Sequence, residues 1–206
     1  MSKKQAPISA LQAYLPPKTY EPVLQYLRHY KVHLTIARER KSILGDYRHR
    51  LGPEAHRISV NGNLNPYAFL VTLLHELAHL LTYEKWGNRV AAHGREWKSV
   101  FGQLLAQFIE HDIFPLDIKT VLLQSLHNPA ASSCADESLL RVLRNYDDKK
   151  NGALFVEDLS PGTLFKTGDG RVFQKGERIR KRYRCVEVAT RKLYLFSPVY
   201  EVTPVA

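Results

Sequence analysis

Two histidines one helical turn apart are the residues of this chain best suited to chemistry. They stand in the segment His75-Glu76-Leu77-Ala78-His79. On an α-helix, positions i and i+4 project from nearly the same face. At that separation two imidazoles can bind one Zn²⁺ ion, and Glu76 lies beside the metal, where it can take a proton from a water molecule. The segment therefore predicts a zinc hydrolase with Glu76 as its catalytic base.

The sequence around this motif predicts a buried helix over residues 65–86. The segment is almost wholly apolar, Asn65 and Pro66 form an N-terminal capping signal, and Gly87 is a stop signal. Two histidines and a glutamate inside such a helix would be costly to bury without a partner. A metal ion is the partner we expect, although histidines can also be hydrogen-bonded core residues.

A catalytic zinc ion usually has three protein ligands, so the motif needs one more. His93 is the favoured candidate because Gly94 follows it and an amphipathic helix is predicted over residues 93–109. A short turn between two antiparallel helices would return His93 toward the first. Glu96 is the rival ligand, and it can also be read as an exposed acidic residue that stabilises the start of the helix.

The motif and its surroundings resemble the SprT-like metalloproteases, the group that contains Spartan. The resemblance rests on HExxH, a short spacer, His-Gly and a helix with an aromatic residue, and on the basic β-rich segment before them. It covers roughly residues 20 to 112. It implies that His75, His79 and His93 are zinc ligands and that Glu76 is the base. It also implies a protein substrate trapped on DNA and an activity promoted by DNA.

Strand and helix patterns predict an α+β fold. A helix is predicted at residues 20–30, and short strands at 32–38, 43–49 and 56–61. In a zincin-like domain these strands would form a small antiparallel sheet beside the HExxH helix. One edge strand would then line the cleft, where an extended substrate can pair with it. By residue type alone, Tyr47, Tyr83 and Arg95 are candidates to stabilise the oxyanion.

The chain divides into three predicted parts. They are a SprT-like metalloprotease domain (1–112), a connector with two short helices (113–154) and a small basic β unit (155–206). Many bacterial relatives end in a four-cysteine zinc ribbon, whereas this chain has only Cys134 and Cys185. We therefore expect one catalytic zinc ion, no intact ribbon and two reduced, buried thiols.

Positive charge is concentrated in two segments. The formal net charge is +10, and residues 166–192 carry ten Lys or Arg against three acidic residues. Residues 27–57 carry eight against three. Such clusters are typical of proteins that bind nucleic acid, although a charged run can also be a solvated face.

One predicted strand in the C-terminal part, residues 177–188, could contact nucleic acid. Alternation along it would place four guanidinium groups on one face, with an aromatic ring available to stack on a base. These residues are Arg178, Arg180, Arg182, Arg184 and Tyr183. The other interpretation is an edge strand that its charges keep soluble.

The chain has no uninterrupted apolar run of about eighteen residues and begins without an apolar signal segment. We therefore expect no membrane association and a cytoplasmic location. The favoured function is a DNA-associated zinc metalloprotease that acts on proteins bound or crosslinked to DNA. The alternatives are a nucleic-acid-binding protein with a structural or weakly active zinc site, and a zinc peptidase or amidase for small substrates.

Overall fold

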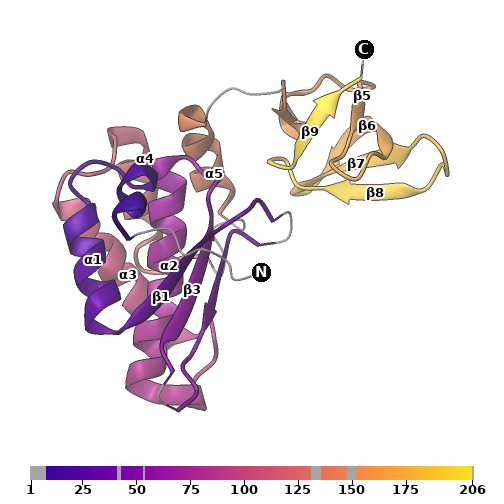
Figure 1. Ribbon diagram of the computed structural model, residues 1–206. Coiled ribbons are helices and arrows are strands. Elements are labelled where there is room, and N and C mark those ends of the chain that lie inside the picture. The colour runs from indigo at the N-terminus through magenta and orange to yellow at the C-terminus, as the bar shows by residue number, and fades with distance from the viewer. Residues whose placement is uncertain (1–7, 41–42, 53, 131–135, 148–151, 206) are drawn as a thin grey trace. The chain divides into compact units, whose positions relative to one another are not determined.

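The computed structural model describes residues 8–40, 43–52, 54–130, 136–147 and 152–205 (Figure 1). The chain divides into two compact units, Met1–Asp147 and Asp148–Ala206. Each unit has its own hydrophobic core. No helix among the described residues is long and apolar enough to cross a membrane.

The first unit is an α+β domain in which helices and a small sheet share one core. Its helices are η1 (Ile8–Tyr14), α1 (Tyr20–His29), α2 (Pro66–Trp86), η2 (Gly87–Arg89), α3 (Arg95–Glu110), α4 (Leu116–Ser125), α5 (Glu137–Leu143) and η4 (Arg144–Tyr146). Its strands are β1 (Val32–Ala37), β2 (Gly45–Arg48) and β3 (His56–Asn61). The helices and strands predicted in this part of the sequence are confirmed, with bounds that differ by at most two residues at either end.

The sheet is mixed, so the prediction of an antiparallel sheet is wrong. Its strand order is β1-β3-β2, with β3 parallel to β1 and antiparallel to β2. The chain runs up, down and up through the three strands in turn. Because β3 inserts between the other two, it lies beside a strand of its own direction. Strand β2 is therefore at one edge of the sheet, and its only partner among the described strands is β3.

Helix α2 forms the centre of the core. The Asn65 side chain accepts a hydrogen bond from the Ala68 backbone N–H at 2.9 Å, and Pro66 occupies the first turn, as the capping signal predicts. The helix ends at Gly87, which has a φ of 61°. Most of its residues are buried, including His75 and Glu76. A helix buried on nearly all sides holds its polar side chains firmly in place.

Helices α4 and α5 fall within the segment expected to be a connector, and they contribute to the core of the first unit. Their buried side chains are Ile118, Leu122, Leu139 and Leu143. The Asn65 amide also donates to the Leu143 carbonyl oxygen at 3.0 Å and thereby ties α5 to the start of α2.

The second unit is an antiparallel six-stranded sheet that curls around a small core (Figure 1). Its strands are β4 (Leu154–Phe155), β5 (Leu164–Lys166), β6 (Val172–Ile179), β7 (Arg182–Glu187), β8 (Leu193–Phe196) and β9 (Glu201–Pro204), and η5 (Val156–Asp158) follows β4. Cys185 is a buried free thiol in this core. Cys134 lies outside the described residues.

Candidate metal centre and its cleft

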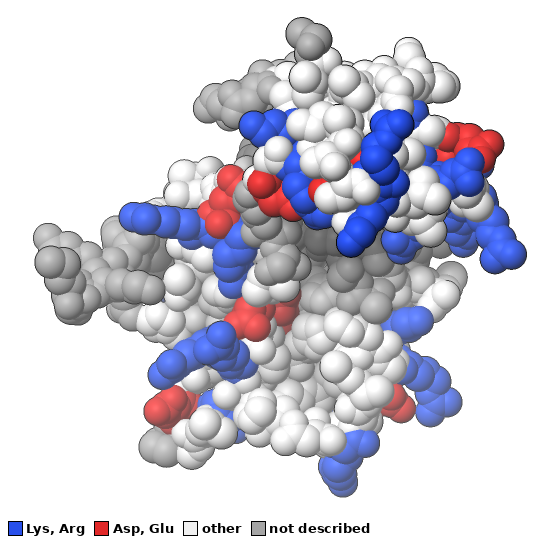
Figure 2. All heavy atoms as spheres, turned by 90° about the vertical axis from the view of Figure 1, so that its right-hand side faces the viewer, with Lys and Arg blue, Asp and Glu red and all other residues white. Residues whose placement is uncertain are grey.

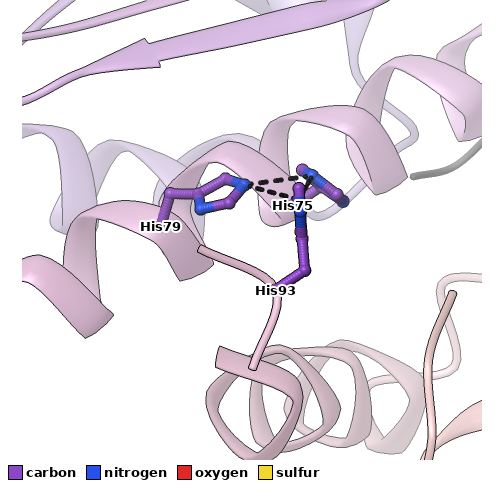
Figure 3. A group of neighbouring side chains, drawn as sticks. All are labelled: His75, His79 and His93. Carbon is purple, nitrogen blue, oxygen red and sulfur yellow. Dashed lines mark hydrogen bonds between the residues drawn. The ribbon is translucent and has the colours of Figure 1, made fainter. Parts of the chain in front are cut away.

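Three histidine side chains converge from two segments of the first unit (Figure 3). His75 and His79 project from adjacent turns of α2, as the helical spacing predicts. His93 lies just before α3, after a turn in which the Gly94 N–H donates to the Ala91 carbonyl oxygen at 3.0 Å. The short connection between α2 and α3 thus brings the third imidazole back to the first two.

The spacing of the three imidazoles fits one metal ion. The Nε2 atom of His79 lies 3.3 Å from that of His75 and 3.1 Å from that of His93, and the third separation is 3.3 Å. Three nitrogens bound to a tetrahedral ion at about 2.0–2.1 Å lie roughly 3.3 Å apart. The donor set and its geometry therefore match a site that leaves one position open for water or substrate.

All three imidazoles are held in the neutral form that can bind a metal. Burial, followed by the charges of His79 and His93, lowers the pKa of His75 to about 3. Burial, followed by the charge of His93, lowers the pKa of His79 to about 4. The pKa of His93 is lowered as well, chiefly by burial.

Trp97 forms an aromatic floor beneath the histidines. Its ring centroid lies 4.7 Å from those of His75 and His93 and 5.2 Å from that of His79. The ring is completely buried in the first turn of α3. Phe101, one turn further along α3, packs against His75 at 5.4 Å. Helix α3 therefore packs against the imidazoles and helps to fix their positions.

Glu76 is almost completely buried beside the histidines. The pKa of its carboxyl is raised to about 8, chiefly by burial and then by the charge of Asp46, with Arg40 acting in the opposite direction. Gly45 packs against it so closely that a Cβ atom at this position would overlap the carboxylate. A glycine at the start of β2 is thus what allows the edge strand to lie next to Glu76.

The loop before β2 is held by a polar network. The Arg40 guanidinium donates through Nε to Asn61 Oδ1 at 2.7 Å and through Nη1 to Ser59 Oγ at 3.0 Å. The Asn61 amide in turn donates to the carbonyl oxygens of Arg40 and Ile43 at 3.1 and 3.0 Å. These bonds anchor the chain that leads into β2 onto β3.

These groups open into a cavity of about 530 Å³. Strand β2 forms one side through Gly45, Asp46 and Tyr47, and the segment 87–93 contributes to the lining elsewhere. The cavity contains His75, Glu76, His79 and His93. A cleft between an edge strand and a helix is suited to an extended polypeptide.

Tyr47 is fixed in this cleft by two buried or half-buried groups behind it. Its hydroxyl lies 3.0 Å from Nδ1 of His56, and Nε2 of His56 lies 3.2 Å from Glu84 Oε1. Burial raises the pKa of Tyr47 well above its usual value, with Tyr83 and Glu84 contributing, so the phenol stays protonated. Its ring is parallel to that of His79, with centroids 6.3 Å apart.

The other residues considered for the site are two candidates to stabilise the oxyanion, Tyr83 and Arg95, and the rival metal ligand, Glu96. Tyr83 lines the cleft, whereas Arg95 does not. Glu96 is outside the three-histidine group, and its carboxylate lies 3.8 Å from the Arg95 guanidinium. The contact of Gly45 with Glu76 and the link from Tyr47 through His56 to Glu84 are not predicted by the sequence. The one sequence signal for the Gly45 contact is the place of this glycine in the β-rich segment before the HExxH motif.

The arginines of the second unit do not lie on one strand, so that prediction is wrong. The predicted strand 177–188 is interrupted by a turn at Arg180 and Lys181, which joins β6 to β7. Arg180 has a φ of 54°, in the left-handed region. Arg178 pairs with Tyr183 across the hairpin and shares its face, whereas Arg182 alternates to the other face.

Arg184 lies on the same face of β7 as Arg182 and forms an ion pair with Glu177. Lys and Arg side chains nevertheless gather on the visible face of the second unit, in the upper part of Figure 2. The charge is therefore concentrated around a hairpin and its turn, and it does not form a single row.

The first unit thus belongs to the class of α+β domains with a group of three histidines that could hold a metal ion. The SprT-like family model matches residues 20–119. The chain is 35% identical over 117 residues to a protein named Protein SprT from Yersinia pseudotuberculosis serotype O:1b (strain IP 31758) and 34% identical to one from Yersinia pestis. Residues 20–119 are thus a SprT-like domain.

The alignments cover 51% of this chain and 63% of each of these relatives, which is less than two thirds of their length. No solved structure matches the chain. The matched region contains α1 to α3, the mixed sheet and all three histidines. The second unit lies outside it.

Proposed function

We propose that this protein is a zinc-dependent metalloprotease. The observation that carries the proposal is the convergence of three Nε2 atoms, 3.1–3.3 Å apart, in the same cleft as the buried carboxyl of Glu76. His75, His79 and His93 would hold the ion. A structural zinc site is normally closed by four protein ligands, whereas these three histidines open into a cavity.

Zinc bound at these histidines would lower the pKa of a water molecule toward about 7 and would polarise a carbonyl group. Glu76 accepts the proton of the attacking water and delivers it to the leaving amine. Without a metal, burial is the main cause that raises the pKa of this carboxyl to about 8, and the charge of a bound Zn²⁺ would favour the ionised form that accepts a proton. Tyr47 stays neutral, and its hydroxyl, which already contacts His56, can form a hydrogen bond with a substrate bound in the cleft.

The unpaired edge of strand β2 is evidence for a polypeptide substrate rather than a small amide. Its outer edge is not paired with any described strand, and its Gly45, Asp46 and Tyr47 line the cleft. A peptide that adds to this edge is recognised by main-chain hydrogen bonds. Main-chain recognition would let the enzyme accept many sequences.

DNA association is supported by two observations. The chain carries a net charge of +10. The SprT-like family that it resembles includes proteases that cut proteins trapped on DNA. The expected contacts are around the β6–β7 hairpin, through Arg178, Arg180, Arg182, Arg184 and Tyr183. A nucleic-acid-binding protein with a structural zinc site fits the buried Glu76 less well, since such a site does not need a base.

The test compares a protein crosslinked to DNA with the same protein free, using the wild type and Glu76→Gln, both loaded with zinc. Cleavage of the crosslinked form alone, lost in the variant, is the expected result. Equal cleavage of both forms would leave a peptidase without a role for DNA. Cleavage by Glu76→Gln would rule out the proposed mechanism.

A further inference from the structure

A second cavity of about 670 Å³ lies next to the cleft, and His93 lines both. It is bounded by α3 from Arg95 to Ala106 and by the chain that follows α4, residues 126–128. An extended chain bound in the cleft and passing His93 would therefore enter this second cavity, which we call the α3 groove.

The α3 groove is built by a close approach of two segments. A Cβ atom at Gly102 would overlap the carbonyl oxygen of Leu126, so only glycine lets this chain pack directly on α3. Lys98 donates from Nζ to Asn128 Oδ1 at 2.7 Å and fastens the same segment one turn earlier. The groove is thus a shaped site whose lysine is held in position.

The polar lining is cationic or neutral. Its ionisable side chains are all of the basic type, and no Asp or Glu is among the lining residues. The polar residues besides His93 are Arg95, Lys98, Ser99, Gln103, His127 and Asn128. The nearby Glu96 contacts the highly exposed Arg95 at 3.8 Å, a surface pair that solvent screens.

The floor of the α3 groove is apolar. Ala106 and Leu126 line it together with the bare backbone of Gly102. An acidic side chain of a peptide has methylene groups that can cover such a floor and a carboxylate that can meet Lys98. A nucleic-acid strand would meet the cations through its phosphates, which carry no methylene chain of their own to cover the floor beside Lys98.

We infer that the α3 groove is a substrate subsite for an acidic side chain, Asp or Glu, of the polypeptide that occupies the adjoining cleft. The inference rests on the proposed peptidase function and deepens it. Main-chain pairing on β2 accepts many sequences, and the groove adds one preference to it. Lys98, fixed by Asn128, is the residue that sets this preference.

The test uses the full chain and a set of quenched fluorescent peptides. Each peptide has the same Ala- and Val-rich host sequence, with one Glu placed in turn at each position around the cleaved bond. A matched peptide carries Gln at that position. We expect kcat/KM to be roughly tenfold higher for Glu than for Gln at one position or at two neighbouring positions.

Two variants assign the preference to the groove. Lys98→Gln should bring the Glu-to-Gln ratio close to one, and Lys98→Glu should favour a peptide with Lys at that position. Lys119→Gln, on α4 and outside the groove lining, is the matched control and should keep the wild-type ratio. A wild-type ratio near one at every position overturns the inference, and so does a Lys98→Gln variant that slows both peptides equally.

A binding measurement separates this inference from the proposed function. Zinc-loaded Glu76→Gln is titrated with the Glu and Gln peptides, and fluorescence anisotropy reports the two dissociation constants. Tighter binding of the Glu peptide, without turnover by the wild type, would retain the subsite and reject the protease. If Lys98→Gln lost binding of a 20-nucleotide oligonucleotide but kept the Glu preference, the groove would be a nucleic-acid contact and the inference would be wrong.

Discussion

Gly45 and Glu76 are packed so closely that the edge strand and the candidate base define each other's position. A methyl group at Gly45 would overlap a carboxylate oxygen of Glu76 and approach Cγ2 of Thr72 to 2.9 Å. The two residues are 31 positions apart in the sequence. Their contact couples the strand expected to hold the substrate to the group expected to move the proton.

Substitution of Gly45 by alanine should therefore displace the Glu76 carboxylate without removing a metal ligand. We expect kcat to fall on the order of 100-fold, since a displacement of about 1 Å in a reacting group has an effect of that size. Zinc stoichiometry should remain one per chain. Loss of zinc in Gly45→Ala, measured by metal analysis, would show that the substitution disrupts the centre as a whole.

Replacement of Trp97 should weaken both the fold and the metal site. Trp97→Ala removes a completely buried ring that touches three imidazoles, and it should lower the free energy of unfolding by about 3–5 kcal/mol. Metal affinity should fall because the imidazoles lose their packing. Urea unfolding and a competitive zinc titration measure the two effects. Trp97→Phe should retain more of both, and an unchanged zinc affinity in Trp97→Ala would contradict the role of the floor.

The stability of the metal-free protein should fall as the pH decreases from 6.5 to 5. The pKa values of His75 and His79 are lowered to about 3 and 4 in the folded state, so in this window the unfolded chain takes up protons that the folded chain does not. Each of these two histidines can lower the free energy of unfolding by up to about 1.4 kcal/mol for each unit by which the pH falls. Glu76 acts in the opposite direction because folding raises its pKa to about 8.

Since Glu76 partly offsets the histidines, Glu76→Gln should make the decrease in stability steeper over the same window. Urea unfolding of the metal-free wild type and variant at pH 6.5, 5.75 and 5 provides the comparison. An unchanged slope in Glu76→Gln would mean that Glu76 is ionised in both the folded and the unfolded protein throughout this range.

The basic hairpin should contribute to DNA affinity through phosphate contacts. Replacement of both Arg180 and Arg182 by glutamine should reduce the slope of log K against log salt by about 2, roughly one for each lost contact. Arg184→Gln should have a smaller effect because Arg184 already forms an ion pair with Glu177. The measurement is a fluorescence anisotropy titration at several salt concentrations. An unchanged slope in the double variant would exclude the hairpin.

The sequence predicts the first unit well where the signals are local. Helical periodicity and the Asn65-Pro66 cap are sufficient for α2, and a short connection before an amphipathic helix is sufficient to return His93 to the motif. The order of the strands in the sheet cannot be predicted from local signals, because insertion of β3 between β1 and β2 depends on pairing between distant residues. The turn at Arg180 was missed because Arg-Lys is not a turn signal, and the residue adopts a positive φ in spite of its side chain.

Parts of the site also depend on tertiary structure alone. Tyr47, His56 and Glu84 come from β2, β3 and α2, and no spacing in the sequence links them. The α3 groove likewise needs the return of residues 126–128 to Gly102. In both cases the residue types are unremarkable, and their function follows from which segments pack together.

The exposed edge of β2 has a consequence for target selection. A segment can complete this sheet only if its own backbone N–H and C=O groups are free, so helices and paired strands cannot bind there without first unfolding locally. The protein would then distinguish targets by their local stability more than by their sequence. Folded neighbouring proteins, and other copies of the protease itself, would not be cut. A chain that is locally unfolded by damage or by a covalent attachment would be cut.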